Sequence, residues 1–250
     1  MEAIGVIPAR YASTRFEGKV LADLDGKPVI QHVYERAKQA KLLDDLVVAC
    51  DDERVKKAVL KFGGKAVLTS PDQPTGTDRL TEVVNPIDVK IVVNIQGDEP
   101  FIKSTMIDSI VLELSSNPKI GMATIIKRIE EEKELDDPNV VKVVVDREGY
   151  ALYFSRSCIP FVRDRDSFLK NVMTKSVTFY KHVGLYGYTK DFLFTFKNLP
   201  KTNLEESEKL EQLRAIEHGY RIKTIVTKFD TVGIDTPEDL ERAKALLEKV

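Results

Sequence analysis

The amino-acid sequence predicts an α/β fold, in which a mostly parallel sheet carries helices on both faces and an antiparallel or mixed β arm is embedded in the second half. Over residues 4–95, short and continuously apolar runs alternate with segments of helical periodicity, a pattern typical of parallel strands buried on both faces. From about residue 120, apolar runs follow one another with no long helix between them. The chain has 250 residues, 42% of them hydrophobic, which is enough for one domain over residues 1–250 with the arm at about residues 120–190.

In the first half, we expect each strand to end in a loop or at a helix cap. Apolar residues 4–7 predict the first strand, and Pro8 breaks it. Pro28 ends a turn and starts a helix, and Asp51 and Asp52 follow the second strand as caps of the next helix. The expected strands lie at residues 4–7, 46–50, 65–69 and 91–95, and the expected helices at 28–37, 55–62 and about 77–85.

Between residue 120 and about residue 190, we expect strands that pair without crossover helices. They lie at residues 121–128, 140–146, 150–156 and 182–188, with an acidic linker at 130–139, and a further strand is expected at 220–229. Asp191 begins a short aromatic helix, and an amphipathic helix is expected at residues 206–217 with Leu210 and Leu213 facing inward. Thr236 is expected to cap the last helix, which Pro237 starts.

The loop at residues 8–19 is the strongest candidate for a ligand site. It carries Arg10, Arg15 and Lys19 among hydroxyl-bearing residues that include Ser13, and it follows the first strand directly. Ligands bind outside the carboxyl ends of strands in open α/β sheets, and guanidinium and ammonium groups offset the charge of phosphates. The loop therefore predicts a triphosphate site. The alternative is an ordinary solvated loop with three chance cations.

Two carboxylates are expected at the same edge of the sheet. Asp98 follows the strand at residues 91–95, and Asp235 follows the strand at residues 220–229. Two bare carboxylates about 4 Å apart repel by about 4 kcal/mol at an effective dielectric constant of 20, and a divalent cation removes that cost. Mg²⁺ prefers one or two carboxylates together with phosphate oxygens, so the pair predicts a magnesium site. The alternative is that both aspartates are helix caps.

Composition and missing motifs exclude several other classes of protein. The net charge of −2 gives no general reason to bind nucleic acid or an anionic membrane. The sequence has no G-x-G-x-x-G after a strand and no G-x-x-x-x-G-K-[ST], which argues against a nicotinamide dehydrogenase and a P-loop NTPase. Without a signal peptide, a membrane span or clustered cysteines, we expect a cytoplasmic protein with no membrane insertion.

Several motifs in order along the chain resemble those of the 3-deoxy-manno-octulosonate (Kdo) cytidylyltransferases, also called CMP-Kdo synthetases. These motifs are IPARYASTRFEGKVL in the first loop, GTDR at 76–79, QGDEP at 96–100, LEQLRA at 210–215 and GIDTPEDL at 233–240. The resemblance implies a Rossmann-like nucleotidyltransferase sheet. It also implies transfer of CMP from CTP to Kdo or a close analogue, with release of pyrophosphate, for lipopolysaccharide biosynthesis. It further implies Mg²⁺ as cofactor and a homodimer, with the β arm on the dimer and sugar side.

The resemblance also implies roles for single residues. The nucleotide side comprises Pro8, Ala9, Arg10, Ser13, Lys19, Thr75, Thr77, Arg79, Gln96 and Gly97. The sugar side comprises Arg15, Arg163, His182, Tyr186, Glu211 and Gln212. Asp98 and Asp235 hold the metal, and with Lys19 and Arg10 they are the expected catalytic residues. The chain departs from the family pattern at Phe16, Glu17, Cys50 and Thr75, which bears on nucleotide affinity more than on reaction type.

Two alternative functions stay open from the sequence. One is another sugar nucleotidyltransferase, acting on a sialic acid, a hexose phosphate or an erythritol phosphate. The other is a non-catalytic nucleotide-binding domain, although a binder needs no second carboxylate beside Lys19. No residue distinguishes Kdo from an 8-amino analogue as the acceptor.

Overall fold

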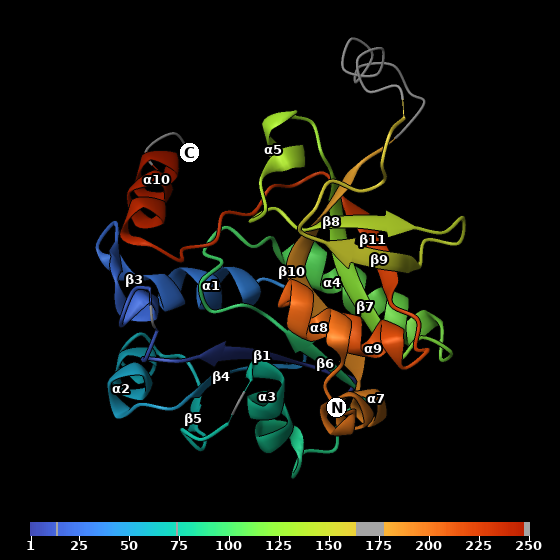
Figure 1. The fold of residues 1–250 in the computed structure, drawn as a ribbon. Helices are drawn as coiled ribbons and strands as arrows, with labels where there is room; N and C mark the ends of the chain where they lie inside the picture. The colour runs from blue at the N-terminus through green and yellow to red at the C-terminus, as the bar shows by residue number, and fades with distance from the viewer. Residues whose placement is uncertain (14, 74, 164–177, 248–250) are drawn as a thin grey trace.

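The computed structural model describes residues 1–13, 15–73, 75–163 and 178–247, and a twisted sheet lies at its centre (Figure 1). The strands follow the order β11-β7-β10-β6-β1-β4-β5, and β8 pairs with β10 and with β9. Their bounds are β1 (Ala3–Ala9), β4 (Asp45–Cys50), β5 (Ala66–Leu68), β6 (Ile91–Asn94), β7 (Met122–Arg128), β8 (Lys142–Val145), β9 (Ala151–Ser155), β10 (Tyr180–Thr189) and β11 (Lys223–Thr227).

The direction of the strands confirms the predicted fold class. β1 runs parallel to both β4 and β6, β4 runs parallel to β5, and β11 runs parallel to β7. β10 is antiparallel to its neighbours β6 and β7. The sheet is therefore mostly parallel, with one long strand inserted in the opposite direction.

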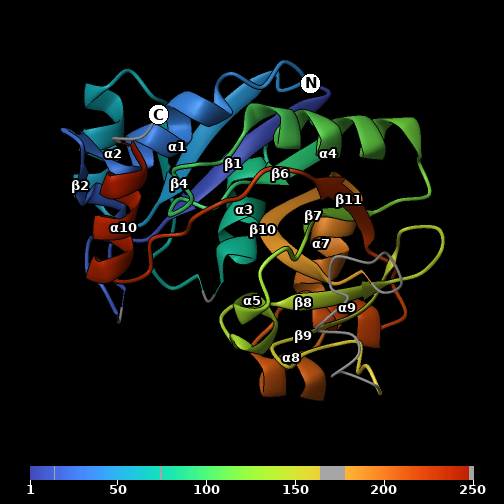
Figure 2. The same ribbon diagram turned by 90° about the horizontal axis from the view of Figure 1, so that it is seen from above.

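Helices cover both faces of this sheet, as Figure 2 shows from above. One face carries α1 (Val29–Ala37), α2 (Glu53–Lys61) and α4 (Ser104–Ser116), and the other carries α3 (Gly76–Val84), α7 (Lys190–Asn198) and α9 (Leu213–Glu217). Each face has its own cluster of buried apolar side chains. This double burial explains why the strands β1, β4 and β6 read as continuous apolar runs.

Local signals placed several helix ends correctly. The Asp52 side chain accepts a hydrogen bond from the Arg54 amide at the start of α2. Thr236 and Asp239 cap α10 (Pro237–Leu247). The Thr236 hydroxyl accepts a hydrogen bond from the Asp239 amide, and the Asp239 carboxylate accepts one from the Thr236 amide. Pro28 differs from the prediction: it is the N-cap of α1, not its first helical residue.

A short hairpin accounts for the position of Pro28. The strands β2 (Asp23–Leu24) and β3 (Lys27–Pro28) pair across a turn in which Asp25 and Gly26 have φ values of 55° and 77°. Two successive positive φ values are typical of the tight turns that suit β-hairpins. Pro28 is thus the last strand residue before α1. A 3₁₀ turn, η1 (Lys19–Leu21), precedes the hairpin.

Helix α4 was not among the elements expected from the sequence. Its buried residues are Met106, Ile107, Ile110, Val111 and Leu114, a spacing that keeps them on one face of a helix. The signal was present in the sequence, and α4 covers β6, β7 and β10. The acidic linker holds a second unexpected helix, the single turn α5 (Lys133–Asp136).

The helix predicted at residues 206–217 is wrong. The structure has two short helices there, α8 (Asn203–Glu208) and α9, separated by Lys209 in the left-handed conformation with φ of 55°. Leu210 and Leu213 are buried as expected. Glu211 and Gln212, however, lie in the turn between the helices, not on a helical face.

The arm predicted at about residues 120–190 divides into two parts. β7 and β10 are members of the central sheet, whereas β8 and β9 form an antiparallel hairpin that joins it through the start of β10. Residues 164–177 of this range lie outside the described residues. The single domain and the role of the arm in a dimer stay predictions.

In the part of the chain that the structure describes, no helix has both the length and the apolar character needed to cross a membrane.

The packing of α4 on β10 predicts the effect of one methyl group. A Cβ on Gly187 would lie 2.1 Å from Ile110 Cγ2, whereas one on Gly184 in the same strand would lie 3.6 Å from its nearest neighbour. We expect Gly187→Ala to lower the free energy of unfolding by about 1–3 kcal/mol, as overpacking does. Gly184→Ala is the matched control and should unfold near the wild type in a denaturant titration. Equal stability of the two variants would contradict this packing.

Candidate active site

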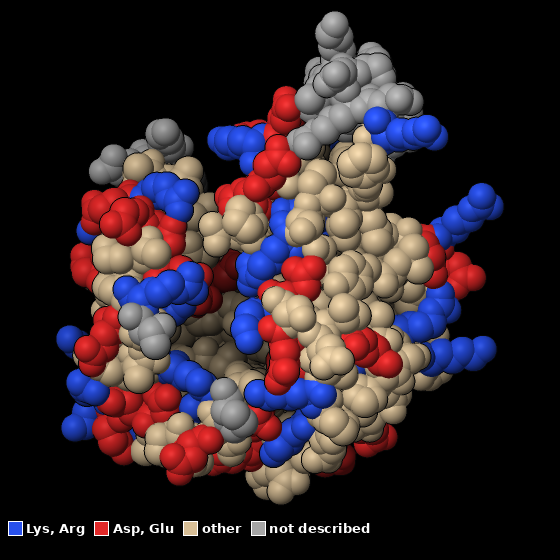
Figure 3. All heavy atoms as spheres, in the orientation of Figure 1, with Lys and Arg blue, Asp and Glu red and all other residues tan. Residues whose placement is uncertain are grey.

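A cavity of 530 Å³ opens at the carboxyl ends of β1 and β6. Figure 3 shows the molecule hollowed at its centre in this view, with Lys and Arg side chains along the hollow. The loops that follow β1 and β6 and the turn before α3 meet here, as expected for a ligand site in an open α/β sheet. The wall consists of Pro8, Arg10, Ala12, Ser13, Lys19, Val20, Thr75, Gly76, Gln96, Gly97, Asp98 and Glu211.

Lys19 joins the two predicted metal ligands. Its Nζ lies 2.5 Å from Asp98 Oδ2 and 2.7 Å from Asp235 Oδ1. Burial alone would lower the pKa of Lys19, but the two carboxylates raise it above its usual value. A backbone hydrogen bond from the Ile234 amide to the Asp98 carbonyl, 2.9 Å long, holds the two segments together. The carboxylates therefore converge on one point that a cation can occupy.

The two aspartates are not helix caps. Thr236 caps α10, which leaves the Asp235 carboxylate free to accept from Lys19 and, at 2.9 Å, from Arg15. The Asp98 carboxylate accepts from Lys19, and the next helix, α4, begins only after Lys103. Arg15, expected on the sugar side, thus lies beside the carboxylate pair.

The loop after β1 is held from behind by an ion pair between partly buried Asp51 and fully buried Arg79. Asp51 accepts from the Tyr11 amide at 3.0 Å and from Arg79 Nη2 at 3.2 Å. Arg79 is fully buried, and its guanidinium also donates to Thr69 Oγ1 and to the Ser70 carbonyl. Arg79 therefore stands behind the cavity wall instead of lining it. Sequence analysis treated Asp51 as a helix cap and missed this contact.

Close backbone packing shapes the nucleotide side of the cavity. A Cβ on Gly97 would lie 2.8 Å from the Pro8 carbonyl oxygen, so only glycine lets the loop after β6 approach β1 this closely. Thr75 and Asp78 form a capping box that directs the start of α3 toward the cavity. Arg10 donates to the Gln73 carbonyl, which holds its guanidinium against the turn before α3. Ala9 is buried at the end of β1.

Among the residues expected on the sugar side, two buried polar atoms have no hydrogen-bond partner in the described part of the chain: Glu211 Oε1 and Tyr186 Oη. The other Glu211 oxygen accepts from Thr77 Oγ1 at 2.7 Å. Burial raises the pKa of Glu211 above its usual value. Unpaired buried polar groups carry a desolvation cost that a ligand with hydroxyl groups relieves.

His182 lies beside Tyr186, with the two ring centres 5.1 Å apart. Its Nε2 is 2.9 Å from Thr124 Oγ1, and burial of the ring lowers the pKa of His182 to about 3. The imidazole is therefore neutral at neutral pH. Gln212 is buried, whereas Arg163 is exposed and directly precedes residues 164–177, which are not described.

Glu99 is a third carboxyl group near the aspartate pair, which sequence analysis did not single out. Burial raises the pKa of Glu99 to about 7, and the nearby charges of Asp98 and Asp235 add to the shift. Its Oε2 atom is buried without a hydrogen-bond partner in the described part of the chain. The only signal in the sequence was its place directly after Asp98.

Three comparisons place this geometry among known proteins. The cytidylyltransferase family profile matches residues 4–225. A 3-deoxy-manno-octulosonate cytidylyltransferase of Geobacter sulfurreducens is 52% identical, with 100% of both chains covered. One of Thermodesulfovibrio yellowstonii is also 52% identical, with 99% of this chain and 98% of that one covered.

A solved structure agrees with these relatives. It is a CMP:2-keto-3-deoxy-manno-octonic acid synthetase complexed with CTP, which superposes with a TM-score of 0.91 at 42% identity and covers 100% of this chain and 99% of that chain. Sequence similarity and fold agree over the whole length, and this chain belongs to the 3-deoxy-manno-octulosonate cytidylyltransferase family.

Proposed function

We propose that this protein transfers CMP from CTP to the anomeric hydroxyl of 3-deoxy-manno-octulosonate, and that the cavity after β1 and β6 holds both substrates. The observation that carries this proposal is the convergence of Asp98 and Asp235 on Lys19 at the edge of a cavity. The full-length similarity to cytidylyltransferases supports it. A product assay with CTP, a divalent metal and a panel of sugar acids tests it directly.

The nucleotide side supplies positive charge to the triphosphate. Arg10, Ser13 and Lys19 line the cavity, and the Gln96–Gly97 backbone lies against β1. The acceptor hydroxyl attacks the α-phosphorus in line, and the bond to the leaving pyrophosphate breaks. In such transfers a protein acts by positioning and by charge stabilisation, so Lys19 and Arg10 need form no covalent intermediate.

The carboxylate pair fits a divalent cation, which we propose is Mg²⁺. Asp98 and Asp235 would hold the ion together with phosphate oxygens, the ligand set that Mg²⁺ prefers. A bound ion would neutralise charge on the α-phosphate. Lys19 and Arg15, which now neutralise the two carboxylates, would then be free to contact phosphate oxygens.

We propose that the acceptor lies against Glu211, Tyr186 and His182. A polyhydroxy acid offers donors to Glu211 Oε1 and either role to Tyr186 Oη, the two buried atoms that have no partner in the described chain. Because burial lowers the pKa of His182 to about 3, its neutral imidazole adds no charge beside Tyr186. Arg163 remains a candidate for the acceptor's carboxylate by resemblance alone.

A non-catalytic nucleotide-binding domain is the weaker alternative. Nucleotide binding alone needs cations, whereas here two carboxylates meet at Lys19 beside the cavity and supply the oxygen ligands that Mg²⁺ prefers. The homodimer and the cytoplasmic location implied by the resemblance are further proposals, and the mass of the protein in solution tests the first.

The carboxylate pair yields the first functional prediction. If Asp98 and Asp235 hold the metal, Asp98→Asn or Asp235→Asn should lower turnover by roughly 10²- to 10³-fold, the effect of losing one charge-stabilising group. Pyrophosphate release measures turnover. Asp25→Asn, in the remote β2–β3 turn, is the matched control and should behave as the wild type. Near wild-type turnover in either active-site variant would overturn the metal assignment.

The cationic loop after β1 yields the second functional prediction. Lys19→Ala and Arg10→Ala should raise the apparent KM for CTP by about tenfold or more, because their charges face phosphate, and leave the KM for the sugar acid within about threefold. Lys41→Ala removes an exposed cation elsewhere and serves as the control. Parallel loss in both constants would point to a collapsed loop instead.

The Tyr186 hydroxyl, which has no hydrogen-bond partner among the described residues, yields the third functional prediction. Tyr186→Phe should raise the KM for the sugar acid by about tenfold without lowering the melting temperature, because the hydroxyl has no partner in the described fold. Tyr150→Phe is the control on a distant tyrosine. An unchanged sugar KM, or a lower melting temperature at constant KM, would remove Tyr186 from the acceptor pocket.

A further inference from the structure

A buried ion pair lies directly behind the acceptor pocket. Arg214, in α9, donates from Nε to Glu205 Oε2 at 2.7 Å and from Nη2 to Glu205 Oε1 at 2.5 Å. Both residues are buried, with 5% of Arg214 and 8% of Glu205 exposed. The Arg214 guanidinium also lies over the Phe196 ring, with Cζ 5.3 Å from its centre. Two hydrogen bonds and one stacked ring leave this guanidinium little freedom to turn.

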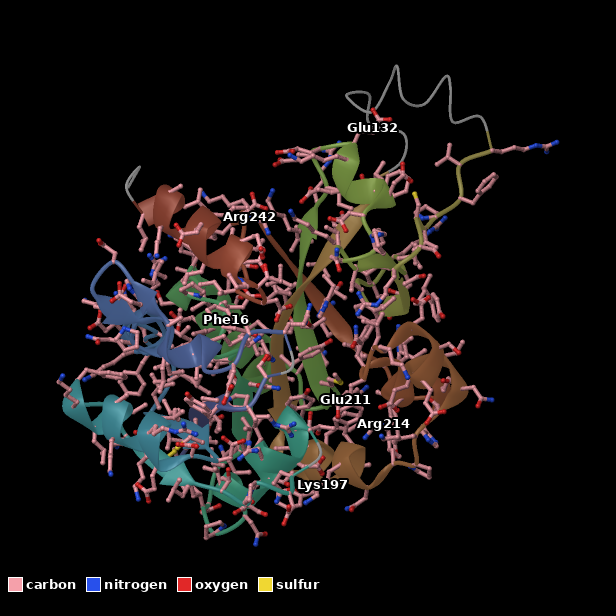
Figure 4. The ribbon with its side chains drawn as sticks, turned by 60° about the vertical axis from the view of Figure 1, so that its left-hand side comes forward. Phe16, Glu132, Lys197, Glu211, Arg214 and Arg242 are labelled. Atoms are coloured by element: carbon pink, nitrogen blue, oxygen red, sulfur yellow. The ribbon has the colours of Figure 1, made fainter. Side chains whose placement is uncertain are left out.

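The same guanidinium reaches the candidate acceptor residue. Arg214 Nη2 is 3.5 Å from Glu211 Oε1, the oxygen that has no hydrogen-bond partner in the described residues. Figure 4 shows the two labelled side chains next to each other beside α8 and α9. The distance is too long for a strong hydrogen bond but short enough for charge attraction. Arg214 therefore attracts this oxygen without occupying its hydrogen-bonding capacity.

Thr77 holds the opposite side of the same carboxylate. Its hydroxyl, at the start of α3, donates to Glu211 Oε2 at 2.7 Å across 134 positions of sequence. Thr77 thus fixes Oε2 of the Glu211 carboxylate by a hydrogen bond, while the charge of Arg214 attracts Oε1. Glu211 has no helix to orient it, because it lies in the turn between α8 and α9.

We propose that Arg214, braced by Glu205, is a positioning residue that orients the Glu211 carboxylate so that one oxygen stays open to a hydroxyl group of the sugar acid. Arg214 does not line the cavity and acts through Glu211 alone. This inference rests on the proposed function, because it assigns Glu211 to the acceptor. It predicts that a change at Arg214 alters acceptor affinity and spares the nucleotide.

The test is a double-mutant cycle between Arg214→Lys and Glu211→Gln. Lysine keeps the positive charge but cannot make the two parallel hydrogen bonds with which Arg214 binds Glu205. We therefore expect Arg214→Lys to raise the KM for the sugar acid by about tenfold and to leave the KM for CTP within about threefold. In the Glu211→Gln background, Arg214→Lys should add less than about twofold, because the residue through which it acts has already changed. Arg221→Lys is the matched control, since Arg221 also pairs with two carboxylates but lies on the exposed surface.

Each outcome decides the question. A larger sugar KM with a non-additive cycle supports the proposal. A lower kcat with both KM values unchanged, equal rises in both KM values, or an additive cycle would overturn it, because a merely structural ion pair gives these results. If Arg214→Lys does not fold, Glu205→Asp replaces it. This change shortens the side chain that holds Arg214 and keeps both charges, and the double-mutant cycle is then run between Glu205→Asp and Glu211→Gln. Failure of the proposed function can be told apart from failure of the Arg214 proposal, because the wild-type protein would then release no pyrophosphate with this sugar acid.

Discussion

The contact of one ammonium group with two carboxylates is the interaction on which the site depends. Lys19 comes from the loop after β1, Asp98 from the end of β6 and Asp235 from the segment before α10. Each of these segments ends or follows a different strand, so the three side chains meet only when the sheet has its native order. Lys19 relieves the repulsion between the carboxylates, and under the proposed function a divalent cation would relieve it when nucleotide binds. The same three groups thus hold this edge of the sheet together.

The antiparallel strand β10 joins the second half of the chain to this edge. Its register sets Tyr186 opposite Asn94, the last residue of β6, so the residues proposed for the acceptor lie next to those proposed for the nucleotide. A parallel strand in this place would need a crossover helix and would emerge at the same edge as β6. Because β10 runs the other way, His182 and Tyr186 lie within the sheet itself. Burial there keeps the imidazole neutral, and the phenol has no hydrogen-bond partner among the described residues.

The two sides of the site are joined by contacts between residues that are distant in sequence. Asp51 connects Tyr11 to buried Arg79, and Thr77 connects α3 to Glu211. Arg79 was expected on the nucleotide side, and Asp51 was expected to cap a helix. In the structure they brace the loop that carries the cations. Such buried pairs are costly to break and are well suited to holding a loop in one position.

Elements whose signals are local could be predicted from the amino-acid sequence. Continuous apolar runs predicted β1, β4 and β6, cap residues placed the starts of α2 and α10, and cations after a strand marked the loop that lines the cavity. Tertiary structure alone decided the break at Lys209, where a non-glycine residue adopts a left-handed conformation and divides a periodic pattern into α8 and α9. It also decided the pairing of Arg214 with Glu205 and of Arg79 with Asp51. Periodicity shows which face of a segment is apolar. It does not show which distant charged residue will neutralise a buried charge, because that pairing depends on where the sheet brings separate segments together.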